Sequence, residues 1–189
     1  MKIQSTNIGE KRTINWKGKM ITTGIFKFPV DHPIFIDSEI VRGDVICDRK
    51  YHGGIDQAVY GYSEKHYPYF KNLHPNLDWN YGMFGENLTI DNLDETQIRV
   101  GDIFKVGETI LEVTKPRQPC MTLGVRFDTM NIVKQFWNST MSGVYFKVLQ
   151  TGFVKVGDEF EQLKSCLENP TIAEVYEMKR VETKGDTKV

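Results

Sequence analysis

The residue in this chain best suited to chemistry is Cys120, at the end of the segment KPRQPC, residues 115–120. The two prolines of this segment lack backbone N–H donors, so a strand arriving through residues 110–114 should end here in an irregular rim. Lys115 and Arg117 add positive charge close to the thiol, and nearby cations favour the thiolate that attacks or binds metals. The segment predicts a reactive or metal-binding cysteine, although most reduced cysteines are small buried hydrophobes.

A second segment with the residue types of a binding site runs from Lys50 to Tyr62 and contains His52 followed by Gly53 and Gly54. Consecutive glycines allow the backbone to turn sharply or to approach a ligand closely, and successive N–H groups can form an anion-binding nest. The Gly-Lys-Ser/Thr ending of a nucleotide-binding P-loop does not follow. The segment therefore predicts a local anion site, followed by a strand from Ala58 to Tyr62.

Other polar residues are open to simpler explanations. Glu86 and Asn87 lie in an apolar frame, so they are either exposed or hydrogen-bonded, and a turn that satisfies them is the simplest reading. Lys27 lies in a strand-like run, residues 21–30, where a solvent-facing lysine is the more common case. His66 falls on the apolar face of a short helix, which favours a core-edge position over a catalytic one.

Strands are the elements that must position these residues. Three Gly-Asp pairs, at 43–44, 101–102 and 157–158, each introduce apolar residues, which is typical of turns leading into strands. Residues 103–106 and 109–114 predict a hairpin that leads directly to the cysteine segment. We therefore expect a mainly β fold with a few short helices.

The last part of the chain predicts one helix. Pro170 suits the start of a helix, and Thr171 and Glu174 have the spacing of a capping box. We therefore expect a main domain over residues 1–165 and a short helical tail over residues 166–189.

Composition excludes several classes of function. The 189 residues suit one domain with at most a small appendage, and 24 Lys and Arg balance 25 Asp and Glu. No overall basic field therefore favours nucleic acid or a membrane surface as a partner. No leader and no apolar run near the roughly 20 residues of a membrane helix is found, so we expect a cytoplasmic protein. The three cysteines are expected to be reduced, and the four histidines form no zinc motif.

Four segments taken together resemble the MOSC domain, which is also found at the C-terminus of molybdenum cofactor sulfurases. They are HGGIDQA at 52–58, FGENLT at 84–89, VGD at 100–102 and RQPC at 117–120, and the resemblance covers roughly residues 17–163. It is closest to stand-alone bacterial members that reduce N-hydroxylated compounds. The resemblance implies a β-barrel with short peripheral helices and a cysteine that either ligates the molybdenum of a molybdopterin cofactor or carries sulfur as a persulfide.

This resemblance also implies residue roles. Cys120 becomes the metal ligand or sulfur carrier, since a soft thiolate is the appropriate ligand type. Asp56 and Glu86 are expected to orient their neighbours, and His66 is grouped with them as a supporting residue. The residues assigned to the pterin and its phosphate are Arg117, His52, Gly53, Gly54, Asn87 and, as the weakest candidate, Lys27.

The function predicted from these residues and the resemblance is reduction of a small N-hydroxylated substrate by a molybdenum cofactor enzyme. The sequence shows no flavin or iron–sulfur motif, so a separate electron-donor protein is expected as a partner. Two alternatives stay open at this point: a sulfur carrier that uses a Cys120 persulfide, and a non-catalytic module that binds an anion or cofactor. Long bacterial members carry a three-helix C-terminal extension, and residues 166–189 resemble a shortened form of it.

Overall fold

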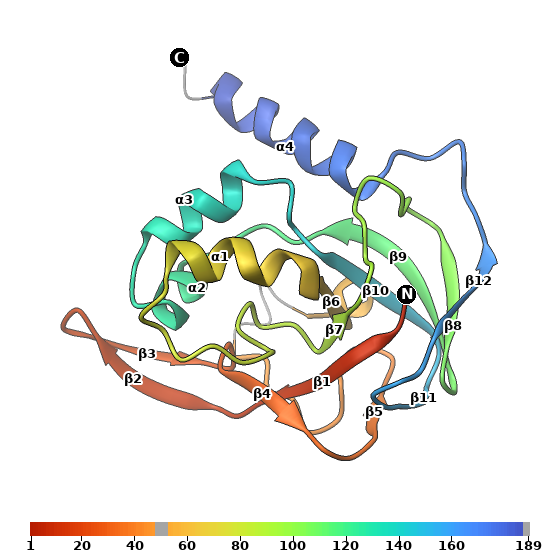
Figure 1. Ribbon diagram of the computed structural model, residues 1–189, viewed down its shortest axis with the longest axis horizontal. Helices are drawn as coiled ribbons and strands as arrows, with labels where there is room; N and C mark the ends of the chain where they lie inside the picture. Colours follow the sequence, from red (N-terminus) through yellow and green to blue (C-terminus); the bar gives the residue numbers. More distant parts are fainter. Residues whose placement is uncertain (48–52, 187–189) are drawn as a thin grey trace.

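The computed structural model describes residues 1–47 and 53–186 and is mainly β, with short helices and one longer C-terminal helix (Figure 1). The strands are β1 (Ile3–Gly9), β2 (Arg12–Trp16), β3 (Lys19–Thr23), β4 (Lys27–Val30), β5 (Ile34–Ile36), β6 (Val59–Ser63), β7 (Leu88–Ile90), β8 (Ile103–Val106), β9 (Thr109–Pro116), β10 (Val144–Gln150), β11 (Gly152–Val154) and β12 (Phe160–Lys164). The helices are the 3₁₀ turns η1 (Ile55–Gln57) and η2 (Glu64–His66), and α1 (Tyr67–Leu73), α2 (Met121–Arg126), α3 (Asn131–Asn138) and α4 (Ile172–Asp186).

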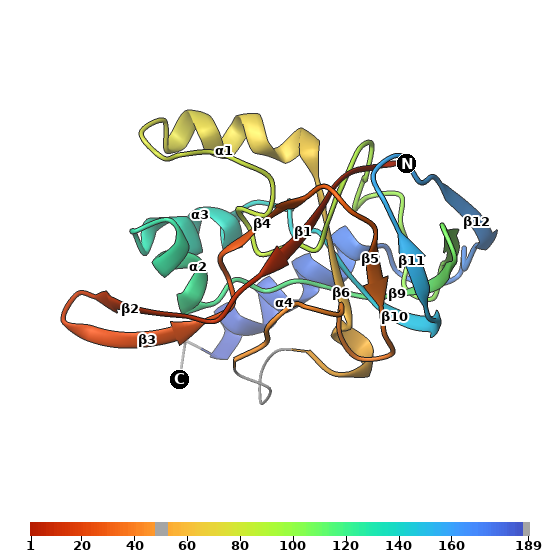
Figure 2. The same ribbon diagram turned by 90° about the horizontal axis from the view of Figure 1, so that it is seen from below.

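Within the described residues, the main sheet has eight strands in the order β12-β8-β9-β10-β6-β7-β1-β4. All its pairings are antiparallel except β6 with β7, which is parallel. The pair β2–β3 forms a hairpin that projects away from the rest of the molecule in both views (Figure 2). The predicted hairpin before the cysteine segment is confirmed as β8–β9.

The predicted closed barrel is not found. The two outermost strands of the main sheet, β12 and β4, are not paired with each other in the described residues. The sheet curls enough to bring Lys2 opposite Glu159, but this contact is an isolated bridge and not a ladder. Backbone hydrogen bonds also join Ile3 to Gly157 and Asp158, and Met1 to Phe160, but they form no strand ladder in the described residues, and the rest of β1 pairs with β4 and β7. The coarser prediction of a mainly β fold with short helices and a C-terminal helix is confirmed.

Two buried clusters hold the site in place. The first lies among the strands and includes Ile3, Val59 and Leu111, as expected from the alternation of buried residues along β9. The second is aromatic and joins the helices to β6; its largest fully buried members include Tyr62, Phe70, Phe84, Phe127 and Phe136. The aromatic cluster supports the segment after β9, because Phe136 contacts Arg117.

The run of residues 21–30, predicted as one strand, is divided into β3 and β4. The reason is a close backbone approach at Gly24, where a Cβ atom would lie 1.9 Å from the carbonyl oxygen of Val45. The hydroxyl of Thr23 also accepts a hydrogen bond from the amide of Ile25, which turns the chain between the strands. Residues 24–26 therefore connect β3 of the β2–β3 hairpin to β4 of the main sheet instead of continuing a single strand.

The C-terminal helix begins with the predicted capping box. Thr171 and Glu174 exchange hydrogen bonds between side chains and backbone amides. Ile172 and Tyr176 are fully buried, and the Tyr176 hydroxyl donates to the carbonyl oxygen of Phe136 at 3.1 Å. Helix α4 is therefore docked on the core, and the division between residues 1–165 and 166–189 stays a prediction. No helix in the described part of the chain has the length and apolarity needed to span a bilayer.

Candidate functional site

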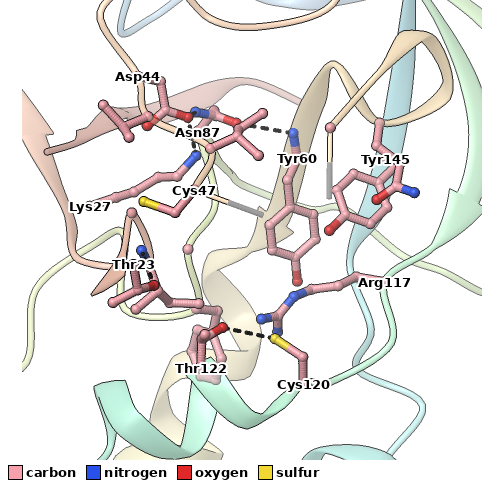
Figure 3. Close-up of a pocket in the computed structure, with 18 of the residues that line it drawn as sticks. Thr23, Lys27, Asp44, Cys47, Tyr60, Asn87, Arg117, Cys120, Thr122 and Tyr145 are labelled. Carbon is pink, nitrogen blue, oxygen red and sulfur yellow. Dashed lines mark hydrogen bonds and ion pairs between the residues drawn. The ribbon is translucent and has the colours of Figure 1, made fainter. Parts of the chain in front are cut away.

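A cavity of about 250 Å³ opens between the start of β4, the end of β9 and the loops beside them (Figure 3). Five of the residues predicted from the sequence line it: Lys27, Gly53, Asn87, Arg117 and Cys120. They come from four separated segments, so the tertiary structure brings five of the ten predicted site residues into one cavity. We call this space the first cavity.

Cys120 stands at the turn between β9 and α2. Strand β9 ends at Pro116, as the missing N–H of proline requires, and Cys120 has the extended backbone of a residue that precedes a helix. Its Sγ atom lies 2.9 Å from the hydroxyl of Thr122, and its side chain is partly buried (Figure 3). The thiol is thus held on a short turn by a local hydrogen bond and faces the first cavity.

Arg117 is a buried cation beside this thiol. It is only 4% exposed, and its guanidinium lies 5.3 Å from the ring centre of Tyr60 and 5.2 Å from that of Phe136. Its buried Nη1 atom has no hydrogen-bond partner among the described residues. A buried donor without a partner is costly, and a bound anion would satisfy it.

The residues around Arg117 keep its side chain positively charged. Burial, the largest effect, lowers the pKa of Arg117, but Tyr60, Cys120, Tyr145 and Tyr62 together raise it above its ordinary value. Burial raises the pKa values of Tyr60 and Tyr145, while Arg117 opposes both shifts. Near neutral pH the guanidinium is therefore charged and the two phenols are neutral.

A polar network closes the other end of the first cavity. Lys27 forms an ion pair with Asp44, whose Oδ2 atom also accepts from the Asn87 amide at 2.9 Å. Asp44 Oδ1 accepts from the backbone amide of Gly9 at 2.9 Å, and Asn87 Oδ1 accepts from that of Tyr60 at 3.3 Å. The interpretation of Lys27 as a solvent-facing strand residue is wrong, because the residue is 8% exposed and paired.

Glu86 lies outside the first cavity and holds the turn before Asn87. It is fully buried and accepts from the Tyr67 and Thr89 hydroxyls and the Gly82 and Phe84 amides. Burial raises the pKa of Glu86, and the hydrogen bonds from Tyr67, Gly82 and Thr89 oppose that shift. Its contacts are those of a residue that orients its neighbours.

The glycine segment lies partly in the site. Gly53 lines the first cavity with a φ of 78°, a backbone conformation that favours glycine, and a Cβ there would lie 2.6 Å from Cδ1 of Ile46, which would have to shift. Gly54 also has positive φ but is not among the lining residues. Asp56 lies in η1, where its carbonyl oxygen accepts from the Thr114 hydroxyl. The predicted role of His52 concerns a position outside the described residues.

His66 also lies away from the first cavity. Its Nε2 atom is 2.9 Å from Oε1 of Glu95, and its ring packs at an edge against Tyr62. Glu95 in turn accepts from the amide of Gly143. This arrangement agrees with the core-edge position favoured by the sequence.

The lining residues that sequence reasoning missed include Asp44, Cys47, Tyr60 and Tyr145. Asp44 belongs to one of the Gly-Asp pairs, and that pattern predicts a turn but not the ion pair with Lys27. No sequence motif distinguishes Cys47 from an ordinary cysteine, yet its thiol shares the cavity with Cys120 (Figure 3). Tyr60 and Tyr145 lie on strands β6 and β10. The residue pattern of these strands predicts burial, but it does not identify the residues that each side chain contacts.

A second cavity, of about 380 Å³, adjoins the first. Five residues line both spaces: Gln57, Cys120, Met121, Thr122 and Tyr145. Cys120 is therefore accessible from two sides. A soft thiolate between a buried cation and a second open space can bind a metal or carry a transferable sulfur atom.

Comparisons with known proteins show which family this chain resembles. The family model described as MOSC domain matches residues 48–161. The uncharacterized protein YflK of Bacillus subtilis (strain 168) is 36% identical over 161 residues, which cover 85% of this chain and 72% of that protein. A Gibberella moniliformis protein named Reductase is 35% identical over 156 residues; the match covers 81% of this chain but 27% of that protein.

A solved structure is similar over nearly the whole chain. The crystal structure of YiiM from Geobacillus stearothermophilus matches with a TM-score of 0.78 and 29% sequence identity. The match covers 96% of this chain and 84% of that one. The overall fold of this chain therefore occurs in a second protein.

Proposed function

Because the chain belongs to the MOSC domain family, we propose that it is a molybdenum-cofactor-dependent reductase of N-hydroxylated compounds, with Cys120 as the protein's ligand to the metal. The observation that carries the proposal is the buried Arg117, which lines the same cavity as the thiol and whose Nη1 atom has no hydrogen-bond partner within the described part of the chain. The 35% identity to a protein named Reductase, over a region that makes up 27% of that protein, supports the same reaction class.

The residues present fit such a cofactor. Cys120 offers a soft thiolate, and Arg117 offers a buried donor suited to a phosphate or another planar anion. Within the described residues, no three His, Cys, Asp or Glu side chains gather into a metal site. A single cysteine ligand suits a metal whose other ligands belong to its cofactor.

Each residue of the first cavity then has a role. When bound, the cofactor supplies the two-electron chemistry that breaks the N–O bond. Cys120 holds the metal at the rim, Arg117 binds negative charge on the cofactor, and the glycine backbone at Gly53 allows a close approach. Asn87 and Lys27 are held by Asp44, so they fix the end of the cavity opposite Cys120.

The reaction needs electrons from another protein. Converting an N-hydroxylated group to the amine or amidine releases its oxygen as water and consumes two electrons and two protons. The sequence offers no flavin or iron–sulfur motif, and we therefore include a separate electron-donor protein in the proposal.

The test combines metal analysis with turnover. Full-length protein purified from cells that make the cofactor should contain molybdenum in near-stoichiometric amount and reduce benzamidoxime when an artificial electron donor is supplied. Protein from cells unable to make the cofactor is the control and should lack both properties. Protein without molybdenum and without turnover after loading with isolated cofactor would contradict the proposal.

A sulfur-carrier function is the second candidate, and the thiol of Cys47 in the same cavity favours it. In such a protein Cys120 would carry a persulfide, and the Cys47 thiolate could attack its outer sulfur atom. The S–S bond to Cys120 then breaks, which leaves a persulfide on Cys47 and a thiol on Cys120. Release of sulfide from metal-free protein on treatment with a reductant distinguishes this candidate from a non-catalytic module.

Arg117→Lys should weaken binding of the cofactor about 10- to 100-fold, although charge is conserved. Lysine lacks the planar two-donor fork, and losing a charge-assisted hydrogen bond typically costs about 1–3 kcal/mol. Calorimetric titration at matched salt measures the difference. The control is Arg42→Lys, since Arg42 is exposed and pairs with Asp37 outside both cavities. Equal affinities of wild type and Arg117→Lys would show that Arg117 does not bind the cofactor.

A further inference from the structure

The second cavity differs from the first in its charges. Arg117, Lys27 and Asp44 line only the first cavity, whereas Lys115 and Lys179 line only the second. No acidic side chain lines the second cavity, and neither lysine forms an ion pair within residues 1–47 and 53–186. Two positive charges thus face one space without a counter-charge.

The two lysines reach this space from different elements. Lys115 belongs to β9, and its ladder partner Tyr145 also lines the cavity. Lys179 belongs to α4 and follows Tyr176 by three residues, so both lie on the same side of the helix. Because Tyr176 is buried against α3, the docking of α4 fixes Lys179 over the cavity.

The remaining wall suits the body of a small organic molecule. Pro116, Pro119 and Met121 provide apolar surface, and Gln57 and Gln118 provide amide groups. The volume of about 380 Å³ lies in the range of small-molecule sites. Cys120 forms part of this wall, so a molecule here would lie next to the proposed metal ligand.

We propose that the second cavity binds the substrate and selects N-hydroxylated compounds that carry an anionic group, a carboxylate or a phosphate, bound by Lys115 and Lys179. This inference rests on the proposed reductase function and adds the substrate class. The anionic group stays unchanged in the reaction. Only the N–O bond breaks: two electrons and two protons are consumed, and the oxygen leaves as water.

The test compares two probes of equal shape and different charge. 4-Carboxybenzamidoxime is anionic at neutral pH, and 4-carbamoylbenzamidoxime is its neutral counterpart. For the cofactor-loaded wild type, the ratio of kcat/KM for the anionic probe to that for the neutral probe should be about tenfold or more at low salt, and it should fall as salt is raised. Calorimetric titration of both probes without electron donor gives the same ratio for binding alone.

Variants of the two lysines test whether these side chains cause the preference for the anionic probe. Lys179→Gln and Lys115→Gln should each lower the ratio about three- to tenfold, as expected for loss of one partly exposed charge-assisted contact. Lys179→Arg should retain the preference, because it keeps the charge. The matched control is Lys155→Gln, since Lys155 is exposed and lines neither cavity.

The outcomes separate this inference from the proposed function. If wild type turns over both probes with equal kcat/KM, or if the lysine variants keep the ratio, the second cavity does not select anions, although the reductase function stands. If no preparation turns over either probe, the reductase function fails, and equal binding of the two probes then overturns the inference as well. Preferential binding that both Lys→Gln variants abolish supports an anion-selective cavity.

Discussion

Cys120→Ser is expected to remove molybdenum from the purified protein and to lower reductase activity by more than about 100-fold. Mutating a supporting partner of a metal ligand typically costs 10- to 100-fold, and loss of the ligand itself should exceed that range. Serine is nearly isosteric with cysteine, and the partly buried site can hydrate its hydroxyl. The free energy of unfolding should therefore change by only about 0.5 kcal/mol.

The measurement combines metal content, kcat/KM and denaturant unfolding of each variant. Cys166→Ser is the matched control, because Cys166 is buried near Gly101 and lines neither cavity. Cys47 is not a suitable control, since its thiol lies in the first cavity. If Cys120→Ser keeps its molybdenum and its activity, or if it unfolds, Cys120 has a structural role only.

Asp44→Asn is expected to lower the free energy of unfolding by about 3–5 kcal/mol, the usual cost of breaking a buried ion pair from one side. The substitution removes the carboxylate that pairs with Lys27, which is 8% exposed. It also weakens the acceptor for the Gly9 amide and the Asn87 side chain. Urea unfolding measures the loss.

A double variant separates the buried charge from local packing. Lys27→Met combined with Asp44→Leu should recover much of the lost stability, because replacing both members of a buried pair with apolar groups is often nearly neutral. Its cofactor binding should nevertheless be weaker than in the wild type, since Asn87 loses the acceptor that orients it. A loss below about 1 kcal/mol in Asp44→Asn would show that water or another group compensates Lys27.

Several features of this protein were determined by sequence alone because they depend on neighbours along the chain. The hairpin β8–β9 follows from two β-rich runs around Gly107, which has positive φ. Strand β9 ends at Pro116 because proline cannot continue the ladder, and this places Cys120 on a turn. The capping box at the start of α4 depends on side chains three residues apart.

Only the tertiary structure decided which of these residues meet. The spacing of Lys27 could not reveal Asp44 as its partner, because the two lie 17 residues apart on segments that approach at Gly24. Tyr60 and Tyr145 surround Arg117 through pairing of β6, β10 and β9, and pairing between strands is not written in any local pattern. The closed barrel predicted from family resemblance failed for a similar reason, because closure depends on a ladder between strands at opposite ends of the sheet. Lys179 shows the same limit, since its helical face could be predicted from its spacing, but the cavity that it faces is formed by a strand about 60 residues earlier in the chain.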